Sequence, residues 1–160
     1  MHSSGVAHLD IKLENIMFNI DTSTPYIGDF GACYYFKDSE KCSSVRGTDA
    51  YRPPEYAKKY SFDARKSDIY SLGVTLHAML TKVYPYDINK ELGKRKIIID
   101  DNLSDECKNL LKKMLKTNPK KRISLDEIMK HPWITNIKKE SKLQKLTSSV
   151  NKCVDGLLGL

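Results

Sequence analysis

The strongest hydrophobic pattern in the chain lies between residues 68 and 83, which read DIYSLGVTLHAMLTKV. Apolar side chains recur there every three or four residues, which is the period of one face of an α-helix. Two more apolar residues, Val74 and Ala78, fall on the other side of the same helix. A helix that is apolar nearly all round packs at the centre of a domain. We therefore predict a central, buried helix, with a main stripe formed by Ile69, Leu72, Leu76, Met79, Leu80 and Val83.

Two further helices are predicted in the second half of the chain. Residues 104–116 carry one apolar stripe, and Ser104 is a suitable N-cap because its hydroxyl can accept a free backbone N–H of the first turn. The acidic residues at 105 and 106 suit the positive end of the helix dipole. Ser124 and Glu127 have the spacing of a capping box, which predicts a short helix that stops before Pro132.

Shorter patterns near the N-terminus predict a β-hairpin. Residues 15–19 (NIMFN) alternate weakly between polar and apolar side chains, residues 19–25 have the composition of a turn, and residues 26–30 can form the partner strand. Residues 31–55 are rich in polar residues, glycine and proline, which predicts a long irregular loop. The predicted fold is mainly α, with a small β-hairpin and a long loop at its N-terminal end.

The composition is that of a soluble globular domain, because 40% of the 160 residues are hydrophobic and 29% are charged. The net charge of +7 comes mostly from lysines on helix-like stretches and near the C-terminus, so we interpret it as a solvated surface and expect no nucleic acid as a partner. No apolar run is long enough to cross a bilayer. The four cysteines are scattered without a C-x-x-C pair, which favours a reduced intracellular compartment, cytoplasmic or nuclear.

Candidate chemistry is concentrated between residues 8 and 55. Residues 8–15 read HLDIKLEN, so Asp10, Lys12 and Asn15 form a D-x-K-x-x-N pattern; D-F-G follows at 29–31, G-T at 47–48 and P-P-E at 53–55. In this order, the motifs resemble the C-terminal lobe of a eukaryotic protein kinase, whose signature contains H-R-D-L-x-x-x-N, D-F-G and A-P-E. The resemblance continues through DIYSLGV, NPKKR and HPW, and it covers residues 2–134. It implies that residues 31–55 form an activation-type loop.

The resemblance implies transfer of a phosphoryl group from ATP to a protein serine or threonine, a reaction that depends mainly on positioning and charge neutralisation. Asp10 matches the family's base, which accepts the proton of the attacking hydroxyl. Lys12 matches the cation that stabilises charge on the transferred group, and a lysine at this place is typical of serine/threonine kinases. Thr48 resembles the threonine that contacts both residues.

The resemblance also implies ATP and Mg²⁺ as cofactors. Mg²⁺ prefers oxygen ligands and is commonly held by a few protein oxygens together with substrate phosphates. Asn15 and Asp29 match the family's two protein ligands for the metal, and Met17 resembles the residue that forms the floor under adenine.

Six other matched residues have structural roles in the family. Glu55 and Arg122 resemble a buried ion pair that ties the end of the long loop to the late helices. Asp68, expected at the start of the central helix, resembles the aspartate that holds the backbone of the catalytic loop. The remaining three are the apolar-stack residues His8 and Phe30 and the D-F-G glycine, Gly31.

Two features depart from the family pattern. Leu9 stands where the family commonly has an arginine that grips a phosphate on the long loop, and leucine can make no charge-assisted bond. The sequence also contains no G-x-G-x-x-G loop and only seven residues before His8, so we expect a truncated catalytic domain that lacks the first lobe, with little or no activity as this chain alone. The first lobe or another protein would then cover an exposed apolar face.

Three hypotheses follow from these observations. The first is a serine/threonine kinase fragment, with residues 1–134 as the partial kinase domain and 135–160 as a lysine-rich tail, in the calcium/calmodulin-dependent or energy-sensing branch. The second is an inactive pseudokinase half-domain that docks proteins. The third, a basic protein that binds nucleic acid or membrane surfaces, rests on the net charge alone.

Overall fold

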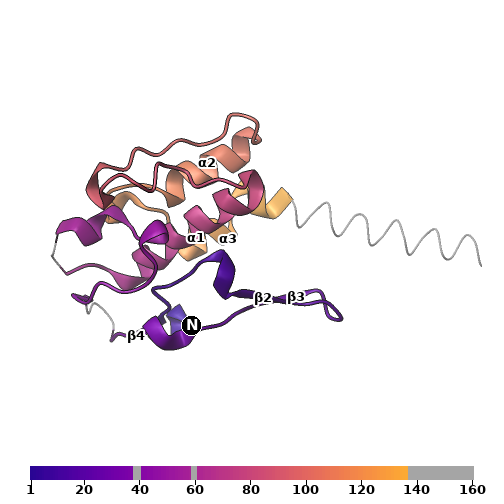
Figure 1. Ribbon diagram of the computed structural model, residues 1–160. Coiled ribbons are helices and arrows are strands. Elements are labelled where there is room, and N and C mark those ends of the chain that lie inside the picture. The colour runs from indigo at the N-terminus through magenta and orange to yellow at the C-terminus, as the bar shows by residue number, and fades with distance from the viewer. Residues whose placement is uncertain (38–40, 59–60, 137–160) are drawn as a thin grey trace, which may run out of the picture. The chain divides into compact units, whose positions relative to one another are not determined.

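The computed structural model describes residues 1–37, 41–58 and 61–136 (Figure 1). The chain divides into two compact units, Met1–Ser124 and Leu125–Leu160. The domain boundary expected between residues 134 and 135 stays a prediction, and the lysine-rich tail lies outside the described residues from residue 137 onward. None of the helices in the described ranges is long and apolar enough to cross a membrane.

Helix α1, Ala64–Thr81, is the predicted central helix, and it begins four residues earlier than expected. Asp63 explains the earlier start, because its carboxylate accepts the backbone N–H of Arg65 and caps the first turn. Asp68 therefore lies inside the helix, and the expectation that it opens the helix is wrong. Met79 and Leu80 are about half exposed, so the predicted all-round burial ends before the last turn.

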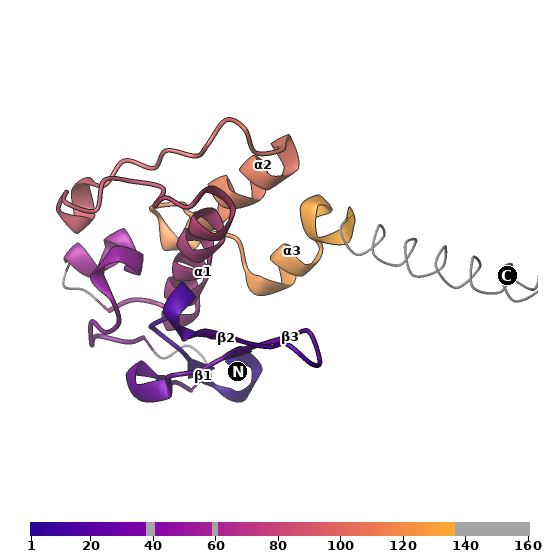
Figure 2. The same ribbon diagram turned by 45° about the vertical axis from the view of Figure 1, so that its right-hand side comes forward.

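Helix α2, Asp105–Met114, confirms the second predicted helix. The Ser104 hydroxyl accepts the N–H of Cys107 at 3.3 Å, and the apolar stripe of the helix is buried. It packs on α1 at Gly73, where an added Cβ would lie only 3.0 Å from Cβ of Met114. Both views of the ribbon show α1 and α2 alongside each other (Figure 2).

The second unit contains helix α3, Leu125–Met129. It confirms the short helix expected between Ser124 and Pro132.

The predicted hairpin is present as β2, Ile16–Asn19, and β3, Thr24–Ile27. The second strand begins two residues earlier than expected and ends before the D-F-G segment, so the placement of that strand at residues 26–30 was wrong. The strands are antiparallel, and Ile16 lies opposite Ile27. Figures 1 and 2 show them as a ribbon that extends beyond α1 and α2. A second antiparallel pair, β1 (Val6–Ala7) and β4 (Tyr34–Tyr35), was not predicted, since two residues are too few to show a period.

The described part of residues 31–55 is mostly irregular. Apart from β4, it contains short 3-10 turns at Phe30–Ala32, Asp49–Tyr51 and the start of Pro54–Lys58. A single bridge between Cys42 and Phe62 ties its middle to the segment before α1.

Two apolar clusters hold the first unit together. One joins the residues around the HLDIKLEN segment to the irregular segment that follows β4, and it consists of Ala7, Leu9, Phe36, Cys42, Tyr56, Phe62 and Ala64. The other joins α1 to segments before and after it and consists of Tyr51, Tyr70, Val74, Tyr86 and Leu115. The first cluster includes residues on either side of the D-F-G segment, so it fixes the neighbours of that segment in place.

Candidate active site

Asp10, Lys12 and Thr48 form a closed triangle of polar contacts. The ammonium of Lys12 lies 3.0 Å from Oδ2 of Asp10 and donates to Oγ1 of Thr48 at 2.7 Å. The backbone N–H of Thr48 donates to the other carboxylate oxygen, Oδ1 of Asp10, at 2.7 Å. Thr48 lies 36 residues beyond Lys12. The fold thus joins two distant segments at one carboxylate.

These contacts set the charge states of Asp10 and Lys12. Burial pushes the pKa of Asp10 upward, but hydrogen bonds from Lys12 and Thr48 outweigh it and leave the pKa below its ordinary value. The pKa of Lys12 is raised, chiefly by its hydrogen bond to Asp10. Both groups are therefore charged at neutral pH.

Asn15 holds the backbone of the segment that carries Asp10. It ends the 3-10 helix Leu13–Asn15, and its buried side-chain amide donates to the backbone carbonyl of Asp10 at 2.9 Å. The backbone carbonyl of Asn15 accepts the N–H of Gly28 at 2.8 Å, which extends the β2–β3 pairing by one residue pair. The hairpin therefore brings Asn15 next to the residue that precedes Asp29.

Asp29 adopts a left-handed backbone conformation with a φ of 57°. This region is sparsely populated for residues other than glycine, although aspartate enters it more readily than most. The carboxylate Oδ1 accepts the N–H of Gly31 at 3.2 Å and so closes the D-F-G turn. Residues held in such conformations are enriched at functional sites.

Asn15 and Asp29 suit a Mg²⁺ ion that is completed by phosphate oxygens. Both offer oxygen donors, and both lie at the same end of the hairpin, since Asn15 pairs with the residue that precedes Asp29. No group of three or more histidine, cysteine or acidic side chains able to hold a metal occurs among the described residues. A two-ligand site agrees with the coordination of Mg²⁺, which usually takes one or two carboxylates and leaves its other positions to water and substrate.

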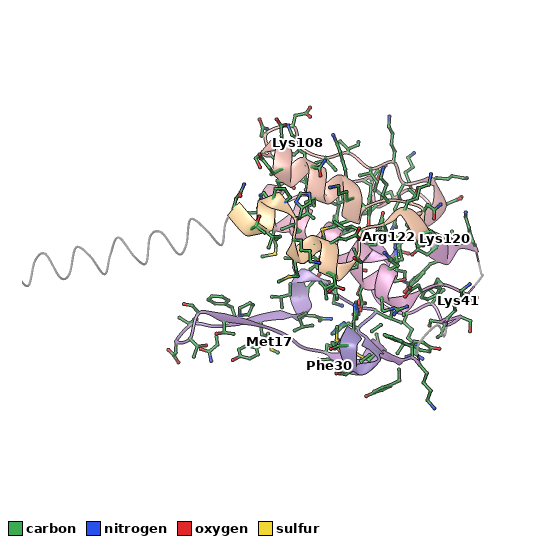
Figure 3. All side chains as sticks on the ribbon, turned by 180° about the vertical axis from the view of Figure 1, so that it is seen from behind. Met17, Phe30, Lys41, Lys108, Lys120 and Arg122 are labelled. Atoms are coloured by element: carbon green, nitrogen blue, oxygen red, sulfur yellow. The ribbon has the colours of Figure 1, made fainter. Side chains whose placement is uncertain are left out.

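Met17 and Phe30 are both exposed, at 58% and 57%. Figure 3 labels Met17 on the hairpin and Phe30 just beyond the end of β3. The methyl group of Met17 lies against Gly28, where an added Cβ would come within 2.6 Å of it. The Phe30 ring contacts the ring of His8, with centroids 5.2 Å apart. An apolar surface thus adjoins Asn15 and Asp29.

The HLDIKLEN segment is tied to helix α1 by contacts of His8 and Leu9 with Asp68. The buried carboxylate of Asp68 accepts the backbone N–H of both His8 and Leu9 at 2.8 Å. The His8 ring contacts Asp10 N through Nδ1 at 3.3 Å and the carbonyl of Gly28 through Nε2 at 2.9 Å. His8 therefore bridges the HLDIKLEN segment and the D-F-G segment.

A scan against family models matches the protein kinase domain to residues 1–134. The chain belongs to the protein kinase family. Serine/threonine-protein kinase pim-2 of Danio rerio is 33% identical over 150 residues, covering 89% of this chain and 48% of pim-2. Serine/threonine-protein kinase SRK2G of Arabidopsis thaliana is 39% identical over 157 residues, covering 87% and 43%. Calcium-dependent protein kinase 13 of the same plant is 35% identical over 150 residues, covering 86% and 28%. The kinase chain spans less than half the length of each.

Glu55 and Arg122 meet inside this kinase chain although 67 residues separate them. The two guanidinium nitrogens donate to the two carboxylate oxygens at 2.7 and 2.8 Å, and Arg122 is fully buried. Arg122 also donates to the backbone carbonyls of Lys66 and Lys116 at 2.6 and 3.0 Å. The pair ties the 3-10 helix Pro54–Lys58 to α1 and to the segment that follows α2.

Three residues of the kinase site were missed at the sequence level. His2 contacts the carboxylate of Asp68 at 2.7 Å, so the first residues of the chain join the support of the loop. Arg52 donates to the carbonyl of Gly47 at 2.6 Å, and Arg46 donates to the carbonyl of Cys33. No local pattern distinguishes these side chains from ordinary surface ones. The partner of His2 is a carboxylate 66 residues away, and the two arginines donate to backbone carbonyls, which every residue carries.

Proposed function

We propose that this chain carries the catalytic-loop half of a site that transfers a phosphoryl group from ATP to a protein serine or threonine. The observation that carries the proposal is the triangle of Asp10, Lys12 and Thr48, with both carboxylate oxygens of Asp10 engaged. Family membership supports a kinase function, and the names of the relatives support the serine/threonine class.

In this proposal, Asp10 is the group that receives the proton of the substrate hydroxyl. Its lowered pKa keeps it ionised and able to accept a hydrogen bond from that hydroxyl. Lys12 remains protonated and can stabilise negative charge that develops on the transferred group. Thr48 positions both side chains, and Asn15 holds the backbone of Asp10.

ATP and Mg²⁺ are the proposed cofactors. Asn15 and Asp29 would hold the metal, which when bound neutralises phosphate charge. Met17 lies on the exposed hairpin, in a place where its side chain can pack against an adenine ring.

The proposed active site needs residues that these 160 do not supply. The sequence has no G-x-G-x-x-G loop, which in kinases covers the phosphates. The hairpin region exposes a set of large apolar side chains, of the kind that a second lobe or a partner protein covers. Those beyond about half exposure are Met17, Phe18, Ile20, Tyr26, Phe30 and Tyr35. We propose that a first kinase lobe, in this chain or another, binds there.

The second candidate function is a pseudokinase module that docks proteins without transferring phosphate. Leu9 favours it, because this side chain is buried in the apolar cluster of Phe36, Cys42 and Phe62 and can grip no phosphate. The three described cysteines are free thiols, which agrees with the proposed reduced cytoplasmic or nuclear location for either function. The branch of the kinase family also stays a proposal.

A thermal-shift experiment with the full chain separates the two functions. A nucleotide that binds only the folded state raises the melting temperature. We expect ATP with Mg²⁺ to raise it, and the Asp29→Ala variant to lose the magnesium-dependent part. Phosphate transfer to a generic protein substrate would then follow, with Asp10→Asn as the inactive control. The absence of any shift at millimolar ATP would refute catalysis by this chain alone and favour the docking module.

A further inference from the structure

A recess lies on the first unit, outside the site of Asp10, Lys12 and Thr48. Its volume is about 660 Å³, within the usual range of ligand pockets. The wall is formed by the 3-10 helix Pro54–Lys58, the segment leading into α1, and the turn that precedes Arg122. No residue of the triangle belongs to the lining.

Some charged side chains of this recess have partners of opposite charge within the described ranges and others do not. Its two carboxylates are already engaged by arginines outside the lining, Glu55 by Arg122 and Asp63 by Arg65. Among its cations, Arg95 is paired with Asp49, and Lys66 donates to a backbone carbonyl.

Three lysines of the lining remain without an ion pair in the described part of the chain. They are Lys41, Lys58 and Lys120, all exposed at the edge of the recess. They come from three separate segments, and Figure 3 shows Lys41 and Lys120 on the same side of the molecule as Arg122. The lining thus gathers positive charge from three segments of the chain at one recess.

Part of the lining is apolar. It consists of Pro54, Ala57, Phe62 and Pro119, of which Phe62 belongs to the apolar cluster around Leu9. Lysines beside apolar side chains are complementary to a segment that carries carboxylates beside one or two apolar side chains. Opposite charges at the edge of an interface mainly speed the association of the two molecules and fix their relative alignment, and they add less to affinity.

We propose that this recess binds a carboxylate-rich, partly apolar peptide segment of a partner protein. The proposal goes beyond phosphoryl transfer and does not depend on it, since none of the catalytic candidates lines the recess. A segment of this kind would anchor the partner to the face that carries Pro54–Lys58.

Fluorescence anisotropy of a labelled twelve-residue peptide, built from glutamate with two leucines, tests the proposal with the full chain. We expect saturable binding that weakens as salt increases. The variant Lys58→Gln/Lys120→Gln should bind about fivefold more weakly. The matched control Lys90→Gln/Lys113→Gln removes the same charge from exposed lysines outside the lining and should leave binding within about twofold.

A further variant keeps the test decisive if the double lysine variant folds poorly. Ala57 is exposed and lines the recess, so Ala57→Glu adds a negative charge there without disturbing the core, and it should also weaken binding. Equal loss in the control variant, or equal binding of a peptide with glutamine in place of glutamate, would overturn the proposal. Displacement of the peptide by millimolar inorganic phosphate, or tighter binding of a single-stranded oligonucleotide at the same lysines, would overturn it as well.

Discussion

The carboxylate of Asp68 accepts the backbone N–H of Leu9 at 2.8 Å, and Leu9 has a φ of 60°. A branched side chain in the left-handed region is strained by about 1–3 kcal/mol, so this conformation persists only when its surroundings impose it. The second bond from Asp68, to the N–H of His8, and the burial of the Leu9 side chain supply that constraint. The backbone turn in front of Asp10 is therefore set from helix α1.

Asp68→Ala should destabilise the fold by about 3 kcal/mol or more. The change leaves the buried N–H groups of His8 and Leu9 without their acceptor, and each unsatisfied group costs about 1–3 kcal/mol. Urea denaturation measures the loss. Asp63→Ala, which removes the cap of the same helix and a partly exposed ion pair with Arg65, should cost about 1 kcal/mol. Similar losses in the two variants would contradict the role given to Asp68.

Gly47→Ala should destabilise the chain by about 2 kcal/mol or more. Gly47 has a φ of 79°, and an added Cβ would lie 2.1 Å from the carbonyl oxygen of Leu9, which is far inside contact distance. The backbone would have to shift, and Thr48 with it. Gly93→Ala is the matched control, because its Cβ would meet Ala57 at an ordinary 3.5 Å. Its denaturation midpoint should stay close to that of the parent chain, and a Gly47 variant that did the same would disprove the prediction.

Leu9→Arg should destabilise the chain by about 4 kcal/mol or more, although the family commonly has arginine at this place. Leu9 is only 4% exposed and packs in the apolar cluster, so a charged guanidinium would replace an apolar side chain among Phe36, Cys42 and Phe62. Leu13→Arg, at a residue 38% exposed, should change stability by about 1 kcal/mol or less. A stable Leu9→Arg chain in thermal unfolding would show that the cluster can open to solvent.

Arg122→Met should be more destabilising than Glu55→Gln. Loss of Arg122 leaves the buried Glu55 carboxylate without its cation and removes a donor to the carbonyls of Lys66 and Lys116. Removing one partner of a buried pair costs about 3–5 kcal/mol. Glu55→Gln keeps an acceptor for one guanidinium nitrogen. Urea midpoints of both variants give the order, and the reverse order would mean that the contacts to Lys66 and Lys116 contribute little.

Lys12→Met should raise the pKa of Asp10 and weaken the dependence of stability on acid pH. The pKa of Asp10 is lowered in the folded chain, so its contribution to stability is present above the ordinary value of 3.8 and is lost as pH falls through the lowered value. Without Lys12, ionised Asp10 contributes less to the free energy of unfolding, so less of that free energy is lost when the carboxylate is protonated. Carbon NMR of the Asp10 carboxyl and urea unfolding at about pH 7 and about pH 3 measure both effects.

A control for this titration is Lys94→Met, which removes a well-exposed lysine paired with Glu91. It should leave the pKa of Asp10 unchanged, because exposed pairs are strongly screened by solvent. If Asp10 titrates at the same pH in the parent and in Lys12→Met, the hydrogen bonds from Thr48 alone account for its pKa.

Local pattern and capping were sufficient for most of the helices and the hairpin. The stripe of α2 and its cap at Ser104 depend on residues a few positions apart, and the β2–β3 hairpin joins adjacent strands through a short turn. The start of α1 was misplaced because Asp63 resembles any other polar loop residue until its capping bond is seen. The pairing of β1 with β4 joins two-residue strands nearly thirty positions apart, which no periodicity reveals.

The sequence by itself determined the order of the motifs, and through them the kinase family and the residue types available to the site. Only the tertiary structure decided which groups are in contact, such as Lys12 with Thr48 and Asp68 with Leu9. It also decided that three lysines from separate segments line one recess. The physical reason is that a hydrogen bond or ion pair depends on positions to within a fraction of an ångström. Those positions are set by the packing of the apolar clusters, which join segments remote in the chain and leave no local pattern.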